Sequence, residues 1–125
     1  MAQVSVRYIV HDVDEAIAFY TKLLGFEILT NAAPAFADVK NGNLRLLLSG
    51  PKSSAGRPMT DGTTPRPGGW NRIHFVVDDL AAEVDRLREA GGKFRNDLVQ
   101  GPGGQQILLV DPSGNLVELF QPAGR

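Results

Sequence analysis

The sequence contains no cysteine and has almost no net charge, with 13 Lys and Arg residues against 14 Asp and Glu. The lack of cysteine excludes a disulfide framework, a thiolate metal site, an iron–sulfur cluster and a cysteine nucleophile. The near-zero charge argues against a general nucleic-acid binder, which normally carries a basic surplus. No apolar run approaches the ~20 residues that span a bilayer, and the first residues do not resemble a signal peptide. We therefore expect a cytoplasmic protein without membrane or nucleic-acid partners.

What the sequence does contain is typical of a globular protein. Its 125 residues are 42% hydrophobic and 22% charged. This length fits one compact domain, or two very small modules that share a core. A chain of this size buries enough surface to fold without disulfides or structural metals.

The first half changes from a strand pattern to a helix pattern and back. Residues 4–10 are apolar at every second position, which predicts a strand with one face against helices and one more polar face. Asp12 stands where a helix N-cap would sit, and the apolar spacing after it predicts an amphipathic helix over 13–24 that stops at Gly25. Further strands are expected at about 26–31, 35–40 and 44–49, with a tight turn at Asn41-Gly42.

The same order of patterns returns in the second half. A strand is predicted near 72–77, a helix after the next N-cap candidate Asp79, and strands near 93–99, 105–110 and 115–121. A shift of 67 residues brings residues of the same class together: Val6, Tyr8, Val10, Asp12, Val13, Ile17, Tyr20 and Gly25 fall on Ile73, Phe75, Val77, Asp79, Leu80, Val84, Leu87 and Gly92. With five extra residues in the second half, Asn43-Leu44 falls on Asn115-Leu116. This predicts an internal duplication of two βαβββ modules.

The two modules, 1–49 and 71–125, form one predicted domain and are separated by residues 50–70. This segment has no periodic apolar pattern and holds five glycines and four prolines. A loop of this length is either a flexible linker or a functional flap. The lid interpretation rests on Met59 and Trp70, because both are large apolar residues with no core pattern to join.

With these modules in place, the chain resembles the vicinal oxygen chelate superfamily, which includes glyoxalase I, bleomycin-resistance proteins and extradiol dioxygenases. The blocks that carry the resemblance are Val10-x-Asp12-Val13, Phe19-Tyr20, Leu23-Leu24-Gly25-Phe26, Val77-x-Asp79-Leu80 and Asp111-Pro112-Ser113-Gly114-Asn115 followed by Glu118-Leu119. The resemblance implies an α+β fold in which the two βαβββ modules form an incomplete barrel with helices outside. It also implies a homodimer.

The resemblance further implies a divalent metal held by one residue early in the first strand and one in the last strand of each module. Those positions are Ser5 and Leu46 in the first module, and Arg72 and Glu118 in the second. Only Glu118 matches, because serine is a poor ligand, leucine is none and arginine is a cation. We therefore expect no cofactor. A divalent ion (Zn, Ni, Fe or Mn) on His74 and Glu118 is the alternative.

Arg72 and Glu118 would then face each other as an ion pair, since neither charge can stay unpaired in a closed cavity. Arg7, Arg72 and His74 could together recognise a carboxylate or phosphate, because a guanidinium binds such groups through two prongs. His74 is either a cavity-lining residue or a general base.

The leading functional hypothesis is a glyoxalase/bleomycin-resistance-type protein that binds a small anionic or aromatic compound without the usual metal. The ligand-binding candidates are Ser5, Arg7, Arg72, Trp70 and Phe36; His74 and Glu118 are the catalytic candidates. The first alternative is a metal-dependent lyase, isomerase or dioxygenase that uses His74 and Glu118. The second is metal-free proton transfer by the same two residues.

Overall fold

The computed structural model describes residues 3–124, and the chain divides into two compact units, the first ending at Gly68 and the second beginning at Gly69. Each unit contains one sheet, and each is described by itself. Within residues 3–124, no helix combines the length and the apolar character needed to cross a membrane.

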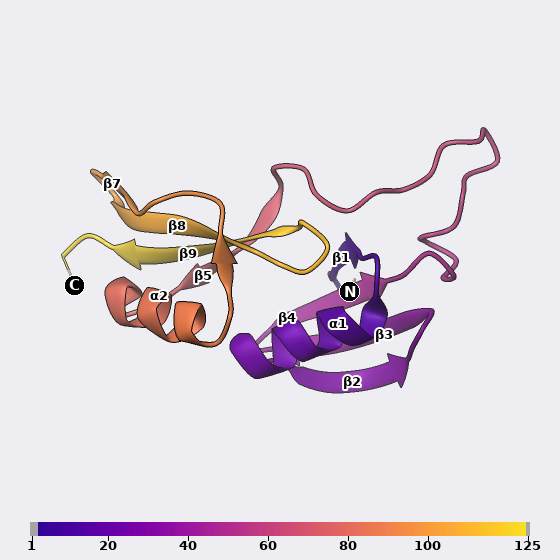
Figure 1. The fold of residues 1–125 in the computed structure, drawn as a ribbon, viewed down its shortest axis with the longest axis horizontal. Coiled ribbons are helices and arrows are strands. Elements are labelled where there is room, and N and C mark those ends of the chain that lie inside the picture. The colour runs from indigo at the N-terminus through magenta and orange to yellow at the C-terminus, as the bar shows by residue number, and fades with distance from the viewer. Residues whose placement is uncertain (1–2, 125) are drawn as a thin grey trace. The chain divides into compact units, whose positions relative to one another are not determined.

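The first unit is a βαβββ arrangement. Its elements in chain order are β1 (Val6–Ile9), α1 (Val13–Ala18), η1 (Phe19–Leu23), β2 (Glu27–Ala32), β3 (Phe36–Asn41) and β4 (Leu44–Ser49). The sheet order is β1-β4-β3-β2, with β1 parallel to β4 and the other pairs antiparallel. Figure 1 shows α1 lying across this sheet, and it contacts β3 and β4. The predicted strands are therefore all present, with small differences at their ends.

The helix predicted over 13–24 begins as expected and then changes its geometry. The Asp12 carboxylate accepts a hydrogen bond from the Glu15 amide at 3.1 Å and so caps α1. From Phe19 the turns widen into the π-helix η1. The Thr21 hydroxyl donates to the Ile17 carbonyl at 2.7 Å where the two segments meet, a side-chain bond that competes with regular backbone pairing.

An aromatic cluster fixes η1 against the sheet. Tyr20 is fully buried, and its ring meets Phe19, Phe26 and Tyr8 edge to face at centroid distances of 4.9, 5.5 and 6.4 Å. Tyr8 belongs to β1, so this contact identifies the helix-covered face of the sheet. The residues that alternate with Tyr8, including Arg7, lie on the other face.

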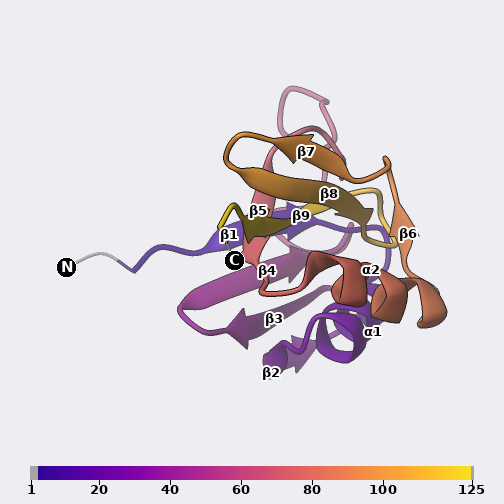
Figure 2. The same cartoon turned by 90° about the vertical axis from the view of Figure 1, so that its left-hand side faces the viewer.

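The second unit repeats the order of the first. Its elements are β5 (Arg72–Val76), α2 (Leu80–Glu89), β6 (Lys93–Phe94), β7 (Val99–Gly101), β8 (Gly104–Val110) and β9 (Leu116–Pro122). The sheet order is β5-β9-β8-β6, and the short β7 also pairs with β8 (Figure 2). The Asp79 carboxylate caps α2 by accepting from the Ala82 amide at 3.1 Å. These two sheets and their helices confirm the α+β class, and neither sheet closes into a barrel within residues 3–124.

The strand predicted near 93–99 is interrupted, and an asparagine explains the interruption. The Asn96 side-chain oxygen accepts a hydrogen bond from the Leu108 amide at 3.0 Å. A side chain thus occupies the position on β8 that a continuous strand would fill with a backbone carbonyl. The result is two short strands, β6 and β7, in place of one.

The strand registers correct one detail of the duplication. On the polar face of the second sheet, Glu118 pairs with His74. On the corresponding face of the first sheet, Arg7 pairs with Leu47, whereas Leu46 pairs with Val6 on the helix side and is fully buried. The counterpart of Glu118 is therefore Leu47 rather than Leu46, because the second module has four extra residues before its last strand and not the five that the sequence predicted.

Residues 50–71 contain neither helix nor strand (Figure 1), but the first part of this segment is well organised. In residues 50–57, which we call the strap, the buried Ser53 hydroxyl donates to the Gly50 carbonyl at 2.7 Å and accepts from the Gly56 amide at 2.9 Å. The backbone passes so closely that a Cβ on Gly56 would collide with the Gly50 carbonyl. The strap is thus a built turn of the first unit, anchored where Gly50 bonds to the Ala35 carbonyl at 2.9 Å.

Candidate functional site

An ion-paired cluster lies on the polar face of the second sheet. The Arg72 guanidinium donates from Nε to Glu118 Oε1 at 3.0 Å, and Nη2 lies 2.9 Å from the same oxygen. His74 Nε2 lies 3.5 Å from the other carboxylate oxygen. Glu118 is only 7% exposed, so these neighbours compensate a carboxylate that could not remain buried alone.

Aromatic residues extend this cluster at both ends. Arg72 Nη1 donates to the Trp70 carbonyl at 3.2 Å, and the Trp70 ring, 62% exposed, carries the Arg95 guanidinium 4.4 Å from its centre. At the other end, the Phe120 ring lies 5.0 Å from the His74 ring. The second unit therefore presents a buried carboxylate between two cationic or polar groups, with an exposed indole beside them.

The residues around Glu118 do not fit a divalent metal. One carboxylate oxygen already accepts a hydrogen bond from Arg72 Nε and lies 2.9 Å from Nη2, so a positive charge occupies the place where a cation would bind. Catalytic zinc sites use three protein ligands, and here only His74 and Glu118 could serve. In the part of the chain that the structure describes, no group of three or more His, Cys, Asp or Glu residues is placed to hold an ion.

A separate pocket lies in the first unit, between the sheet and the strap. It has a volume of about 440 Å³ and is lined by Arg7, Ala35, Phe36, Lys52, Ser53 and Ser54. Arg7 Nη1 donates to the hydroxyl of the fully buried Ser49 at 2.8 Å. The pocket thus joins two cationic side chains with one aromatic wall and two hydroxyls.

The next row of the same sheet holds a second arginine, which is neutralised. Arg45 Nε lies 2.7 Å from Asp38 Oδ2, and Asp38 is only 2% exposed. Its other oxygen, Oδ1, is buried without a hydrogen-bond partner among residues 3–124. The positive charge of Arg45 is therefore compensated locally.

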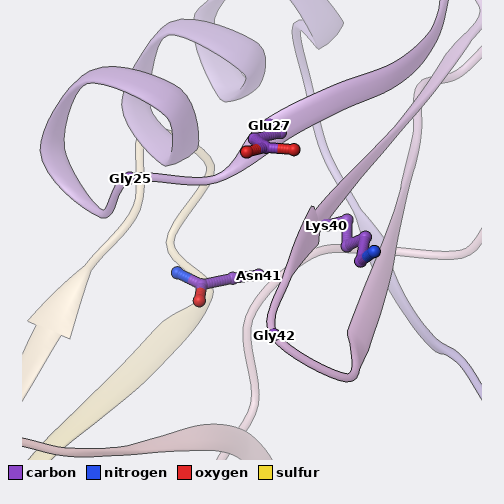
Figure 3. A pocket seen from close by; sticks show the side chains of 5 residues that line it. All are labelled: Gly25, Glu27, Lys40, Asn41 and Gly42. Atoms are coloured by element: carbon purple, nitrogen blue, oxygen red, sulfur yellow. The ribbon is translucent and has the colours of Figure 1, made fainter.

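Another pocket in the first unit, of about 310 Å³, lies at the end of η1 (Figure 3). It is lined by Gly25, Glu27, Lys40, Asn41 and Gly42. Glu27 and Lys40 are register partners on β2 and β3, so their opposite charges balance. This crevice combines a helix end with a hairpin turn and carries no excess charge of either sign.

The structure groups the predicted site residues into two sets. Arg72, His74, Glu118 and Trp70 come together in the second unit, whereas Arg7 and Phe36 line the pocket of the first unit. Ser5 lies one residue before β1 and is half-buried.

Sequence reasoning missed the partners of these residues. Lys52 and Ser54 lie in a segment without periodicity, and their proximity to Arg7 depends on how the strap folds back. Arg95 was likewise hidden, because its contact with Trp70 joins the start of the second unit to a residue near the middle of its sequence. Only the buried Asp38 left a sequence signal, as an acidic residue within an otherwise apolar strand.

With this geometry established, comparison with known proteins identifies the family. The model of the Glyoxalase/Bleomycin resistance protein/Dioxygenase superfamily matches residues 2–119, and the chain belongs to this superfamily. "Putative glyoxylase CFP32" from Mycobacterium bovis is 31% identical over 112 residues. That match covers 88% of this chain but only 41% of the longer relative.

Two solved structures are similar over almost their whole length. A member of the same superfamily from Sphaerobacter thermophilus has a TM-score of 0.76 and 29% identity, covering 97% of this chain and 98% of its own. TnmS3, an antibiotic binding protein from Streptomyces sp. CB03234, has a TM-score of 0.67 and 26% identity, covering 98% and 99%. An antibiotic binding protein is therefore among the solved structures whose fold and length match this chain.

Proposed function

We propose that this protein binds a small anionic or aromatic molecule and needs no divalent metal to do so. The observation that supports this most directly is the Arg72–Glu118 ion pair, with two guanidinium contacts of 2.9 and 3.0 Å on one carboxylate oxygen. It places a fixed organic cation where the family resemblance implies a metal. The similar structure TnmS3 is an antibiotic binding protein, which is consistent with such a role.

The chemistry of the side chains around the two sites supports this ligand class. The Trp70 ring offers a stacking surface beside Arg72 and Arg95, and Phe36 lies beside Arg7. Aromatic faces next to guanidinium groups favour planar, negatively charged compounds, because stacking and two-pronged hydrogen bonding act on the same ligand. Such a protein would sequester or carry its ligand, which requires no reacting group.

The test is a thermal-shift and calorimetric screen of aromatic carboxylates on protein purified without chelator. We expect several of these acids to raise the unfolding temperature, while their neutral amides do not. We also expect metal analysis to show less than one-tenth of an equivalent of Zn, Ni, Fe or Mn. If none of the aromatic acids raises the unfolding temperature at millimolar concentration, the proposal is contradicted.

The second candidate function is a metal-dependent lyase, isomerase or dioxygenase. It is favoured by the 3.5 Å approach of His74 Nε2 to Glu118 Oε2, which gives two donors on adjacent strands. A stoichiometric metal that is lost in Glu118→Ala would support it. Turnover without metal that disappears in His74→Gln would instead indicate proton transfer by the same pair.

We also propose that the protein acts as a homodimer in the cytoplasm. A single-chain mass near 13.5 kDa in light scattering would contradict the dimer.

A further inference from the structure

The pocket of the first unit combines positive charge with an aromatic wall and contains no acidic residue. Arg7 comes from β1, Phe36 from β3, and Lys52 and Ser54 from the strap, so four chain positions converge on about 440 Å³. A volume of this size lies within the range of small-molecule sites. Its lining would attract an anion.

The charge on this pocket is not compensated. In the described part of the chain, neither Arg7 nor Lys52 has a carboxylate partner, whereas Arg45, Arg72 and Arg86 each have one. The hydrogen bond that orients Arg7 goes to the neutral Ser49 hydroxyl at 2.8 Å. Arg7 is thus held in place while its positive charge remains available.

A comparison of the two modules explains why only the first unit has a cation without a carboxylate partner. In the second sheet, Glu118 stands next to His74 in register and neutralises Arg72. In the first sheet the same place next to Arg7 is held by Leu47. One module therefore neutralises its cation internally, and the other lacks the carboxylate that would do so.

The strap fixes the other side of the pocket. The Ser53 hydroxyl bonds to both Gly50 and Gly56, and the Arg57 amide donates to the Ser53 carbonyl at 3.2 Å. These bonds set the path of the chain on both sides of Lys52 and Ser54. A ligand anion would meet a preformed rim, which lowers the entropic cost of binding.

We propose that this pocket is an oxyanion site in which Arg7 and Lys52 bind the carboxylate or phosphate of a planar apolar acid whose ring packs on Phe36. This inference rests on the proposed function and specifies where the charged end of the ligand lies. Arg72, which is already paired with Glu118, then has a structural role, and the second unit is not the primary anion anchor.

The test measures binding of benzoate, phenyl phosphate, inorganic phosphate and benzamide by calorimetry to the full chain. We expect the two aromatic anions to bind, the amide to fail, and inorganic phosphate to bind at least 10-fold more weakly than phenyl phosphate, because it cannot contact Phe36. The stronger of the two aromatic anions tells a carboxylate ligand from a phosphate ligand.

Three variants locate the site. Arg7→Gln and Lys52→Gln should each weaken binding about 10-fold or more, whereas Arg57→Gln, an exposed cation of the strap outside the pocket lining, should change it less than twofold. Leu47→Glu should abolish binding, because it places a carboxylate beside Arg7 as Glu118 stands beside His74. In the wild type, the amide resonances of residues 52–54 should shift on titration, a readout that does not depend on the folding of any variant.

Two results would overturn the inference in different ways. If the aromatic anions bind but Arg7→Gln and Lys52→Gln keep wild-type affinity while Arg72→Gln loses it, the site lies in the second unit and the proposed function still stands. If neither anion binds the wild type at millimolar concentration, the oxyanion site and the proposed function both fail.

Discussion

Replacing Glu118 by leucine would convert the polar row of the second sheet into that of the first, where Leu47 holds the same place. Arg72 would lose one charge-assisted hydrogen bond from Nε, worth about 1.5–3 kcal/mol, and the 2.9 Å ion-pair contact of Nη2. The Arg72 side chain is 29% exposed, so water would recover part of this loss. The burial of the new leucine would offset a little more. We expect Glu118→Leu to lower the free energy of unfolding by about 2 kcal/mol.

The reciprocal change, Arg72→Ser, installs the first module's own residue at the matching position, Ser5. It should cost more, about 3 kcal/mol, because the Glu118 side chain is only 10% exposed and would keep its charge with fewer partners. The double variant removes both charges and should cost no more than either single change. Urea unfolding of the four proteins should therefore give a coupling energy of at least about 3 kcal/mol.

The exposed pair Arg86–Glu83 on α2 is the matched control. Its ion-pair distance is 2.7 Å, shorter than the 2.9 Å of the Arg72–Glu118 pair, but both side chains are more exposed to water. The same cycle on this pair should give less than about 0.5 kcal/mol. If the Arg72–Glu118 cycle is also additive within about 0.5 kcal/mol, burial does not strengthen this pair and the reasoning fails.

Four further predictions concern the first unit. Tyr20→Ala should lower the free energy of unfolding by about 3–5 kcal/mol in urea titrations, since it removes the centre of the aromatic cluster, and an effect below 1 kcal/mol would contradict that packing. Ser53→Ala should cost about 1–2 kcal/mol and weaken benzoate binding several-fold in calorimetry without removing a charge; unchanged affinity would mean the strap does not shape the pocket. Trypsin should cut after Lys52, because the other basic residues of the segment 50–70 precede proline, and bound ligand should slow this cleavage if the segment closes over it. Hydrogen bonds from the Thr63 side chain and amide lower the pKa of Asp61 from 3.8, so Thr63→Val should raise that pKa toward 3.8 in an NMR titration. The stability contributed by the ionised Asp61 is present above its unfolded-state pKa and is lost as the pH falls through the lower folded-state pKa.

Sequence periodicity predicted most of the fold, because the interactions that begin the helices join residues close together in the sequence. Asp12 and Asp79 act as N-caps on amides three residues away, and both bonds are present at 3.1 Å. Alternation also placed Arg72 and His74 on one strand face. What it missed was the one-residue difference between Leu46 and Leu47, since hairpin length depends on turn geometry that apolar spacing does not encode.

The candidate site was predictable only where it lies on strands. Glu118 and His74 pair in register, so their proximity follows from topology once the duplication is recognised. The strap residues could not be placed, because the hydrogen bonds of Ser53 form only after residues 50–57 fold back toward Ala35. The oxyanion pocket is therefore a feature of tertiary structure that has no sequence motif.

The two modules solve the same electrostatic problem in different ways, and this difference carries the functional argument. A cation on the polar face of a sheet must be paired, solvated or matched by a ligand. Arg72 is paired by Glu118, and Arg45 is paired by the buried Asp38. Arg7 is oriented by Ser49 and left without a counter-charge beside Phe36 and Lys52. The second sheet has a carboxylate where the first sheet has Leu47, so its position is saturated, whereas the matching position of the first sheet is the one that we propose to be open to an anion.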